Sequence, residues 1–199
     1  MESVGQAYPA TFEVDRAERI ANWRPLVQWL LAIPHFAILY GLQLVARAVA
    51  IISWFAILFT GKLPEGLANM IGLYIRYNNR ASAYAGFLRE EYPPFVFDPV
   101  APDPGMYPPV RTGFAPELEN RNRVTVGFRL ILAIPQLIVV AILGIAALLV
   151  WLIAFFAVLF TGRWPEGLRT FVVGYMRWVT RVEAYIGLLT DAYPPFRLD

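Results

Sequence analysis

The 199-residue sequence contains no cysteine, one histidine (His35) and three serines. Without cysteine it can form no disulfide, thiol nucleophile or thiolate metal site. The remaining side chains supply no convincing set of nucleophile, base and orienting residue, and His35 has no partners for metal ligation. Neither GxGxxG nor GxxxxGK[ST], the glycine patterns that bind phosphate, occurs. We therefore expect no enzymatic activity, no metal and no cofactor.

Charged residues are also scarce, at 16%, whereas 58% of the residues are apolar and the mean hydropathy is +0.50. This balance is far from that of soluble globular proteins. The apolar residues form two blocks. Residues 130–162 are 33 positions without a charge, and residues 26–61 are 36 positions interrupted only by His35 and Arg47. Each block exceeds the roughly 20 residues that one membrane crossing requires. An acidic N-terminus before so long a block predicts no cleaved signal peptide.

The chain is a tandem duplication with an offset of 101 residues. The motifs LAIP, FTG, PEGL and YPPF, at residues 31, 59, 64 and 92, recur at 132, 160, 165 and 193 without a gap. Residues 31–98 and 132–199 share 30 identities in 68 aligned pairs. A repeat of this strength sets the organisation of the chain. We expect a first membrane repeat at 1–98, a linker at 99–119 and a second membrane repeat at 120–199.

Eight of the sixteen prolines lie between residues 92 and 116, so this segment is expected to be an extended polar connector. Short alternating stretches at Thr11–Asp15 and Phe95–Asp98 are candidates for two small paired strands at the membrane surface, although such short patterns are weak.

Each apolar block ends at a Thr-Gly pair, where Gly61 and Gly162 suit a left-handed helix C-cap. Pro64 and Pro165 then suit the first turn of a new helix, with Glu65 and Glu166 near its positive N-terminus. The basic residues that follow the glycines meet the end of the helix dipole. These are Lys62 and Arg163.

The second helix of each repeat carries aromatic residues on one face and arginines on another. Its pattern is typical of a helix in the membrane interface, with guanidinium groups directed at the phosphates of anionic lipids. A helix packed on its own protein, with arginines paired to acids, fits equally well. The candidate headgroup-binding residues are Arg76, Arg80, Arg177, Arg181, Lys62 and Arg163, and the candidate interfacial aromatics are Tyr74, Tyr84, Tyr175, Trp178 and Tyr185.

Two arrangements of the apolar blocks remain open. Each block could fold back near residues 41–47 as a hairpin, or form one long bent helix divided by a helix break at Pro34 or Pro135. The hairpin is favoured because it puts every lysine and arginine except Arg47 on one side, as the positive-inside rule expects of a cytoplasmic face. The termini and the linker are then expected to be cytoplasmic.

The motifs LAIP, FTG followed by Lys or Arg, PEGL, RxxxRxxAY and YPPF resemble those of the bacterial membrane proteins grouped as domain of unknown function 4389. The resemblance covers nearly the whole chain. It implies a duplicated integral-membrane domain in the bacterial cytoplasmic membrane, without known catalytic residues.

The sequence thus predicts an all-α membrane protein of two tandem repeats, with short extended segments at the membrane surface. We interpret it as a non-enzymatic accessory, scaffold or membrane-organising protein that binds anionic lipids. It could act within a larger membrane complex or as a homo-oligomer. The alternative is a small transporter or channel formed by the two repeats. Nucleic acid is not expected as a partner, because the aromatic residues near arginine belong to amphipathic membrane helices.

Overall fold

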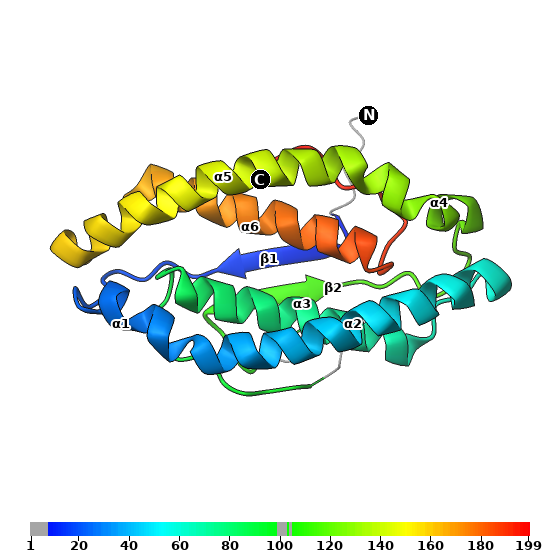
Figure 1. Ribbon diagram of the computed structural model, residues 1–199, viewed down its shortest axis with the longest axis horizontal. Helices are drawn as coiled ribbons and strands as arrows, with labels where there is room; N and C mark the ends of the chain where they lie inside the picture. Colours follow the sequence, from blue (N-terminus) through cyan, green and yellow to red (C-terminus); the bar gives the residue numbers. More distant parts are fainter. Residues whose placement is uncertain (1–7, 99–102, 104) are drawn as a thin grey trace, which may run out of the picture.

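The computed structural model describes residues 8–98, 103 and 105–199, which form six helices and two strands (Figure 1). Their order along the chain follows the duplication, because a strand, a short helix, a long helix and an amphipathic helix occur twice. The elements are β1 (Ala10–Val14), α1 (Arg24–Leu31), α2 (Ile33–Thr60), α3 (Glu65–Ala85), β2 (Val110–Phe114), α4 (Arg123–Gly127), α5 (Arg129–Thr161) and α6 (Glu166–Ile186).

Each apolar block contains one long helix instead of a hairpin. α2 continues without interruption through Gly41 to Arg47, where the chain was expected to turn, and α5 is continuous for 33 residues. The hairpin prediction is therefore wrong, and the long helix is confirmed. Residues 41–47 contain no proline. An uninterrupted helix therefore satisfies the backbone hydrogen bonds of this segment locally. The charge argument for a cytoplasmic face loses its basis, since it depended on hairpins.

The two prolines expected to break these helices differ in their effect. Pro34 lies in the first turn of α2, directly after a break at Ala32 that ends α1, so this prediction is confirmed. Pro135 lies inside α5, and the break in the second copy comes earlier, at Phe128. Pro135 is thus not a helix break, because a proline removes one hydrogen bond and a long helix can continue through it.

The two strands pair antiparallel, with Thr11 opposite Gly113 and Phe12 opposite Thr112. Phe12 and Thr112 are structural equivalents, because their carbonyls accept hydrogen bonds from the equivalent arginines Arg177 (3.2 Å) and Arg76 (3.5 Å). Equivalent residues therefore meet across a local two-fold axis. The strand expected at 11–15 is confirmed to within one residue, but the expected partner was wrong, since residues 95–98 are not a strand.

The segment that leads into each copy packs against the other copy. β1 precedes the first long helix yet contacts α6, and β2 precedes the second long helix yet contacts α3. The backbone N–H of Ile20 donates to the carbonyl of Gly162 (2.9 Å), and that of Arg121 donates to Gly61 (3.0 Å), which is the equivalent bond. The two copies thus form one interlocked unit.

The amphipathic helices α3 and α6 form the middle of three layers. On one side of α3, Asn79 donates to Thr112 of β2 (3.1 Å). On a roughly opposite side, Tyr77 contacts His35 of α2 (2.7 Å). α6 is arranged likewise between β1 and α5. Figure 1 shows α2 and α5 antiparallel along the two long edges, with the sheet at mid-length.

The local signals at the helix ends are confirmed. Gly61 and Gly162 cap α2 and α5 with φ values of 72° and 67°, a left-handed conformation that favours glycine. Glu65 and Glu166 lie in the first turns of α3 and α6. These caps turn the chain back so that each amphipathic helix runs beside its long helix.

Close packing makes one mid-helix glycine sensitive to substitution. A Cβ added at Gly174 would lie 2.7 Å from the carbonyl oxygen of Leu198, whereas one at Gly167 would meet nothing within 4 Å. We predict that Gly174→Ala destabilises the protein by about 1–3 kcal/mol, because the C-terminal segment must move. Gly167→Ala should be neutral or stabilising by up to about 1 kcal/mol. Thermal unfolding in detergent measures both, and equal stability of the two variants would contradict the packing.

Candidate functional site

The outward sides of α2 and α5 form an exposed apolar face. Their inward sides carry small or polar residues such as Ser53 and Ala154, whereas large apolar side chains point away from the protein. Phe59 and Phe160, for example, are each 76% exposed. Soluble monomers rarely expose contiguous apolar patches larger than several hundred Å². The face includes Leu44, Ile51, Phe55, Phe59, Ile138, Ile142, Ile145, Leu149, Leu152, Phe156 and Phe160.

Two helical stretches of the described chain are long and apolar enough to cross a membrane, namely Arg24–Thr60 and Arg129–Thr161. Only 17% and 11% of the residues in their most apolar windows are buried. The core helix of a soluble protein would be mostly buried instead. Length and composition alone are weak support for membrane insertion, but the outward orientation of the apolar side chains adds an independent observation.

The arginines of the first amphipathic helix are buried instead of facing lipid. Arg76 and Arg80 are each 3% exposed, and the Arg80 guanidinium donates to Oδ1 of Asp103 (2.9 Å). Arg76 donates to the carbonyl of Asp98 (3.2 Å) and lies 4.0 Å from the Asp103 carboxylate. This corrects the expectation of a surface-lying basic face, because the strand and the linker cover it. The first copy therefore fits the alternative prediction, in which the helix packs on its own protein and its arginines pair with an acidic residue.

In the second copy, the equivalent arginines bond to backbone carbonyls. Arg177 donates to Phe12 of β1 (3.2 Å) and to Leu198 (3.2 Å), and Arg181 donates to Arg197 (3.1 Å) and to Asp199. Arg181 is buried and Arg177 is half-buried. All four arginines therefore hold a strand, the linker or a terminal segment against an amphipathic helix.

The aromatic residues predicted to be interfacial lie inside the protein or face the long helices. Tyr84, Trp178 and Tyr185 are buried, and Tyr74 and Tyr175 are half-buried against α2 and α5. Polar contacts are equivalent in the two copies, since His35 contacts the Tyr77 hydroxyl (2.7 Å) and Gln136 accepts from Trp178 Nε1 (2.7 Å). An interfacial position for these rings is thus not what the structure shows.

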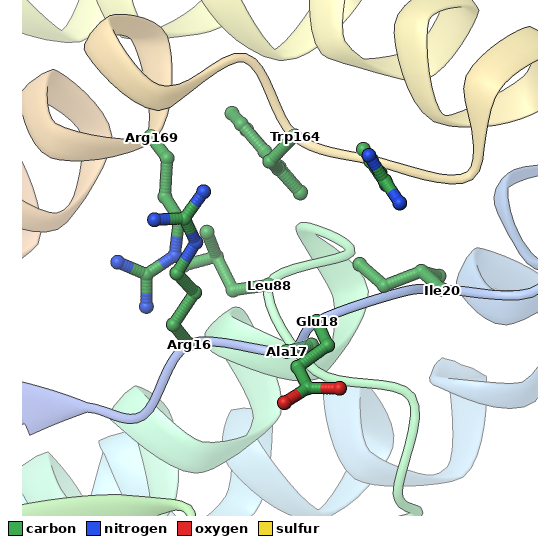
Figure 2. Close-up of a pocket in the computed structure, with 8 residues that line it drawn as sticks. Arg16, Ala17, Glu18, Ile20, Leu88, Trp164 and Arg169 are labelled. Atoms are coloured by element: carbon green, nitrogen blue, oxygen red, sulfur yellow. The ribbon is translucent and has the colours of Figure 1, made fainter.

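The remaining candidate headgroup residues, Lys62 and Arg163, are exposed and follow the C-terminal ends of α2 and α5, and these helix ends lie at opposite ends of the molecule in Figure 1. Lys62 pairs with Glu119 (3.0 Å). Arg163 lines a cavity of about 50 Å³ with Arg16, Trp164 and Arg169. Figure 2 shows the guanidinium groups of Arg16 and Arg169 close together, with the carboxylate of Glu18 directed elsewhere.

The cluster of Arg16, Arg163 and Arg169 carries excess positive charge. Burial lowers the pKa of Arg169, and the neighbouring positive charges of Arg16 and Arg89 lower it further. Arg16 has one acidic partner, Glu166 (2.9 Å). An anion entering this cavity would relieve the repulsion, so binding of lipid phosphate stays a prediction for Arg163.

A second cavity, of about 160 Å³, lies between α2, α3 and α6. We call it the α2 cavity. Its wall is mainly small or aliphatic, and four polar side chains reach it from three helices. The lining residues are Gln43, Ala46, Arg47, Ala50, Ile71, Tyr74, Ile75, Glu183, Ile186 and Gly187.

The α2 cavity arises where the two copies differ. Ala50 corresponds to Trp151 in the second copy, and the Trp151 indole Nε1 donates to the carbonyl of Gly86 (3.2 Å), so the ring occupies the equivalent region. The polar residues differ as well. Gln43, Arg47 and Glu183 correspond to Gly144, Leu148 and Ser82, whereas Tyr74 has an equivalent tyrosine.

Glu183 is the acidic group of the α2 cavity. Its Oε1 accepts a long hydrogen bond from Asn78 (3.5 Å), and its Oε2 is buried without a hydrogen-bond partner among the described residues. Burial raises the pKa of Glu183 to about 7, although the Asn78 bond lowers it. A buried carboxyl group with a raised pKa that lines a cavity is a candidate for a functional site.

A family model described as Domain of unknown function (DUF4389) matches residues 22–96 and residues 123–197. The chain belongs to this family. No curated protein and no solved structure matches it. Membership in DUF4389 confirms the duplication and the resemblance drawn from the motifs, and each matched range ends just after a YPPF motif. It assigns no activity.

Sequence reasoning singled out two residues of the α2 cavity, Tyr74 as an interfacial aromatic and Arg47 as a charge within the first apolar block, but it did not identify the cavity. The missed signal lies in the alignment of this DUF4389 chain with itself. Three aligned pairs of the two copies differ in size or polarity, namely Gln43 and Gly144, Ala50 and Trp151, and Ser82 and Glu183. The residues that line the cavity, Gln43, Ala50 and Glu183, are not all close in sequence. Only the packing of three helices shows that these unlike pairs converge on one cavity.

The buried arginine pair predicts a large effect of its acidic partner. Asp103→Ala should cost about 3–5 kcal/mol of stability, because it leaves two buried guanidinium groups without their carboxylate. Glu119→Ala removes the exposed partner of Lys62 and should cost at most about 1 kcal/mol. Thermal unfolding in detergent compares them. Similar losses for both variants would show that Asp103 is not the anchor of these arginines.

Glu183 also predicts a pH-dependent stability. Because its pKa is raised from 4.5 to about 7 in the folded protein, folded chains bind more protons than unfolded chains between these values, and the stability from this group falls as pH rises. Glu183→Ser, the residue of the first copy, should therefore raise the unfolding temperature more at pH 8 than at pH 5. An equal change at both pH values would contradict a buried, titrating carboxyl group.

Proposed function

We propose that this DUF4389 protein is a non-enzymatic membrane protein that inserts its apolar face into one leaflet and organises the lipids or proteins around it. The observation that carries the proposal is the opposition of its two faces. α2 and α5 expose large apolar side chains, whereas the outer side of the sheet exposes Thr11, Glu13 and Arg111. Such a molecule is suited to the boundary between lipid and water.

Insertion along the membrane surface fits the dimensions better than spanning. At 1.5 Å per residue, α2 and α5 are about 42 and 50 Å long, against about 30 Å for a hydrocarbon core. If these helices crossed the bilayer, the sheet at mid-length would lie at its centre. The exposed ion pairs of Arg111 with Glu13 (3.1 Å) and Asp15 (2.9 Å) would then be surrounded by lipid, which is costly.

Anionic headgroups are the proposed lipid partners. The cluster of Arg16, Arg163 and Arg169 lies beside the C-terminal end of α5, so a protein lying in the interface would bring it to phosphate depth. Lys62 occupies the corresponding end of α2. We propose the bacterial cytoplasmic membrane as the location. Assembly into a homo-oligomer or a larger membrane complex remains part of the proposal.

The first experiment tests insertion of the apolar face. Replacing Ile142, Ile145, Leu149 and Leu152 by glutamine should abolish flotation of the protein with lipid vesicles, because it makes the middle of the exposed side of α5 polar. The matched control, Thr11→Gln with Glu13→Gln, changes the opposite side and should float as the wild type does. Loss of flotation in the control, or none in the α5 variant, would contradict the proposal.

The second experiment separates in-plane insertion from spanning. Lys62 and Arg163 follow the ends of α2 and α5, which lie at opposite ends of the molecule (Figure 1), and the chain has no native cysteine. Single Lys62→Cys and Arg163→Cys variants should react with an impermeant thiol reagent from the same side of sealed membranes if the helices lie in one leaflet. Labelling from opposite sides would instead establish two spanning helices and exclude the in-plane arrangement.

A further inference from the structure

The α2 cavity is polarised by two charges that do not neutralise each other. Glu183 enters it from α6, and Arg47 enters it from α2. The ion pairs within 4.0 Å among the described residues do not join them. Arg47 is exposed, so it marks the open side, whereas the carboxyl group of Glu183 is enclosed. The cavity thus presents an acidic interior and a basic rim.

Tyr74 lies between the two charges. Burial raises the pKa of its hydroxyl, Glu183 raises it further, and the hydrogen bond from Gln43 together with the charge of Arg47 lowers it. Gln43 Nε2 donates to the Tyr74 hydroxyl (3.3 Å). Both charged residues therefore act on the same phenol. Its ring adds an aromatic surface of the kind that attracts a cation.

The chain keeps this cavity open at a position where the second copy closes it. Trp151 fills the equivalent region of the second copy, yet the first copy has Ala50 at this position. Glu183 carries a desolvation cost that Ser82, its equivalent, does not. A ligand in this open space could complete the hydrogen bonds of the buried carboxyl group.

We propose that the α2 cavity binds the headgroup of a zwitterionic aminophospholipid, with the primary ammonium at Glu183 and the phosphate at Arg47. A primary ammonium donates three hydrogen bonds and can satisfy the unpartnered Oε2 of Glu183. Arginine is well suited to phosphate because its planar guanidinium can donate two parallel hydrogen bonds. The order of the two charges in the cavity matches their order in such a headgroup.

The size of the α2 cavity agrees with this ligand. Its volume of about 160 Å³ is close to that of protein cavities that hold one benzene molecule, about 150 Å³. A phosphoethanolamine group, which has about eight non-hydrogen atoms, fits that space with its phosphate at the rim. A quaternary trimethylammonium group is bulkier and has no N–H to donate, so phosphatidylcholine should be excluded.

The position of the acyl chains rests on the proposed function. If the apolar face of α2 and α5 lies in one leaflet, a lipid of that leaflet can place its headgroup at the level of α3 and α6. Its tails then run beside the outward side chains of α2. The same headgroup could reach the cavity as a free water-soluble compound, so the test must distinguish the two sources.

The test uses the full chain purified in a non-ionic detergent, so that ligand binding is measured separately from vesicle flotation. Binding of short-chain phosphatidylethanolamine, phosphatidylcholine and phosphatidylglycerol, and of glycerophosphoethanolamine without acyl chains, is followed by calorimetry. Phosphatidylethanolamine should bind at least 10-fold more tightly than each of the other three. Failure here with normal flotation would overturn the ligand assignment and leave the proposed function intact.

Three variants locate the site. Ala50→Trp should fill the cavity as Trp151 fills its equivalent and lower the affinity at least 10-fold, and Glu183→Gln should do the same by removing the carboxylate. The control Ile51→Trp adds the same ring on the exposed side of α2 and should bind as the wild type does. An unfolding temperature within a few degrees of the wild type shows that each variant is folded.

Two results would overturn the proposal. Equal affinity for phosphatidylethanolamine and phosphatidylcholine would mean that no ammonium is recognised at Glu183. Unchanged binding by Ala50→Trp would place any lipid site elsewhere. Equally tight binding of glycerophosphoethanolamine, lost in Ala50→Trp, would retain the headgroup chemistry but reject a membrane lipid as its source.

Discussion

The burial of α3 and α6 is the constraint on which the rest of the structure depends. Each helix carries arginine at two positions one turn apart, and each must satisfy those guanidinium groups while most of its surface is covered. The strands, the linker and the C-terminal segment provide carbonyls and Asp103 for this purpose. With that side occupied by polar backbone, α2 and α5 take the roughly opposite sides and direct their apolar residues outward.

Duplication explains the symmetry of this arrangement, and divergence explains what is distinct about its halves. Gln28 donates to the carbonyls of Tyr84 (2.7 Å) and Arg89, and its equivalent Arg129 donates to Thr190 (2.8 Å) and Asp191, so one structural task is met by different side chains. The differences at Ala50 and Glu183, by contrast, do not conserve a structural contact. They exchange a filled, apolar region for an open, charged one, which is why we regard that region as functional.

Much of the architecture could be predicted from local signals. The Gly61 and Gly162 caps, the proline-glutamate helix starts and the duplication all depend on short-range chemistry that the sequence shows directly. The hairpins could not be excluded, because a long apolar helix and a pair of short ones have the same composition. Likewise, the spacing of Arg76 and Arg80 shows that they share one side of a helix but not whether lipid or protein covers that side.

The packing of β1 and β2 against the opposite copies has a consequence for synthesis of the chain. The N-terminal β1 reaches its place on α6 only after almost the whole protein has been made, and α3 lacks β2 until the linker has emerged. At a translation rate of about 5–20 residues per second, the nascent first half would persist for several seconds or longer with the buried arginines of α3 still uncovered. During that interval its long apolar helix α2 is already complete. Under the proposed function, docking of α2 to a bilayer therefore precedes the pairing of the two halves.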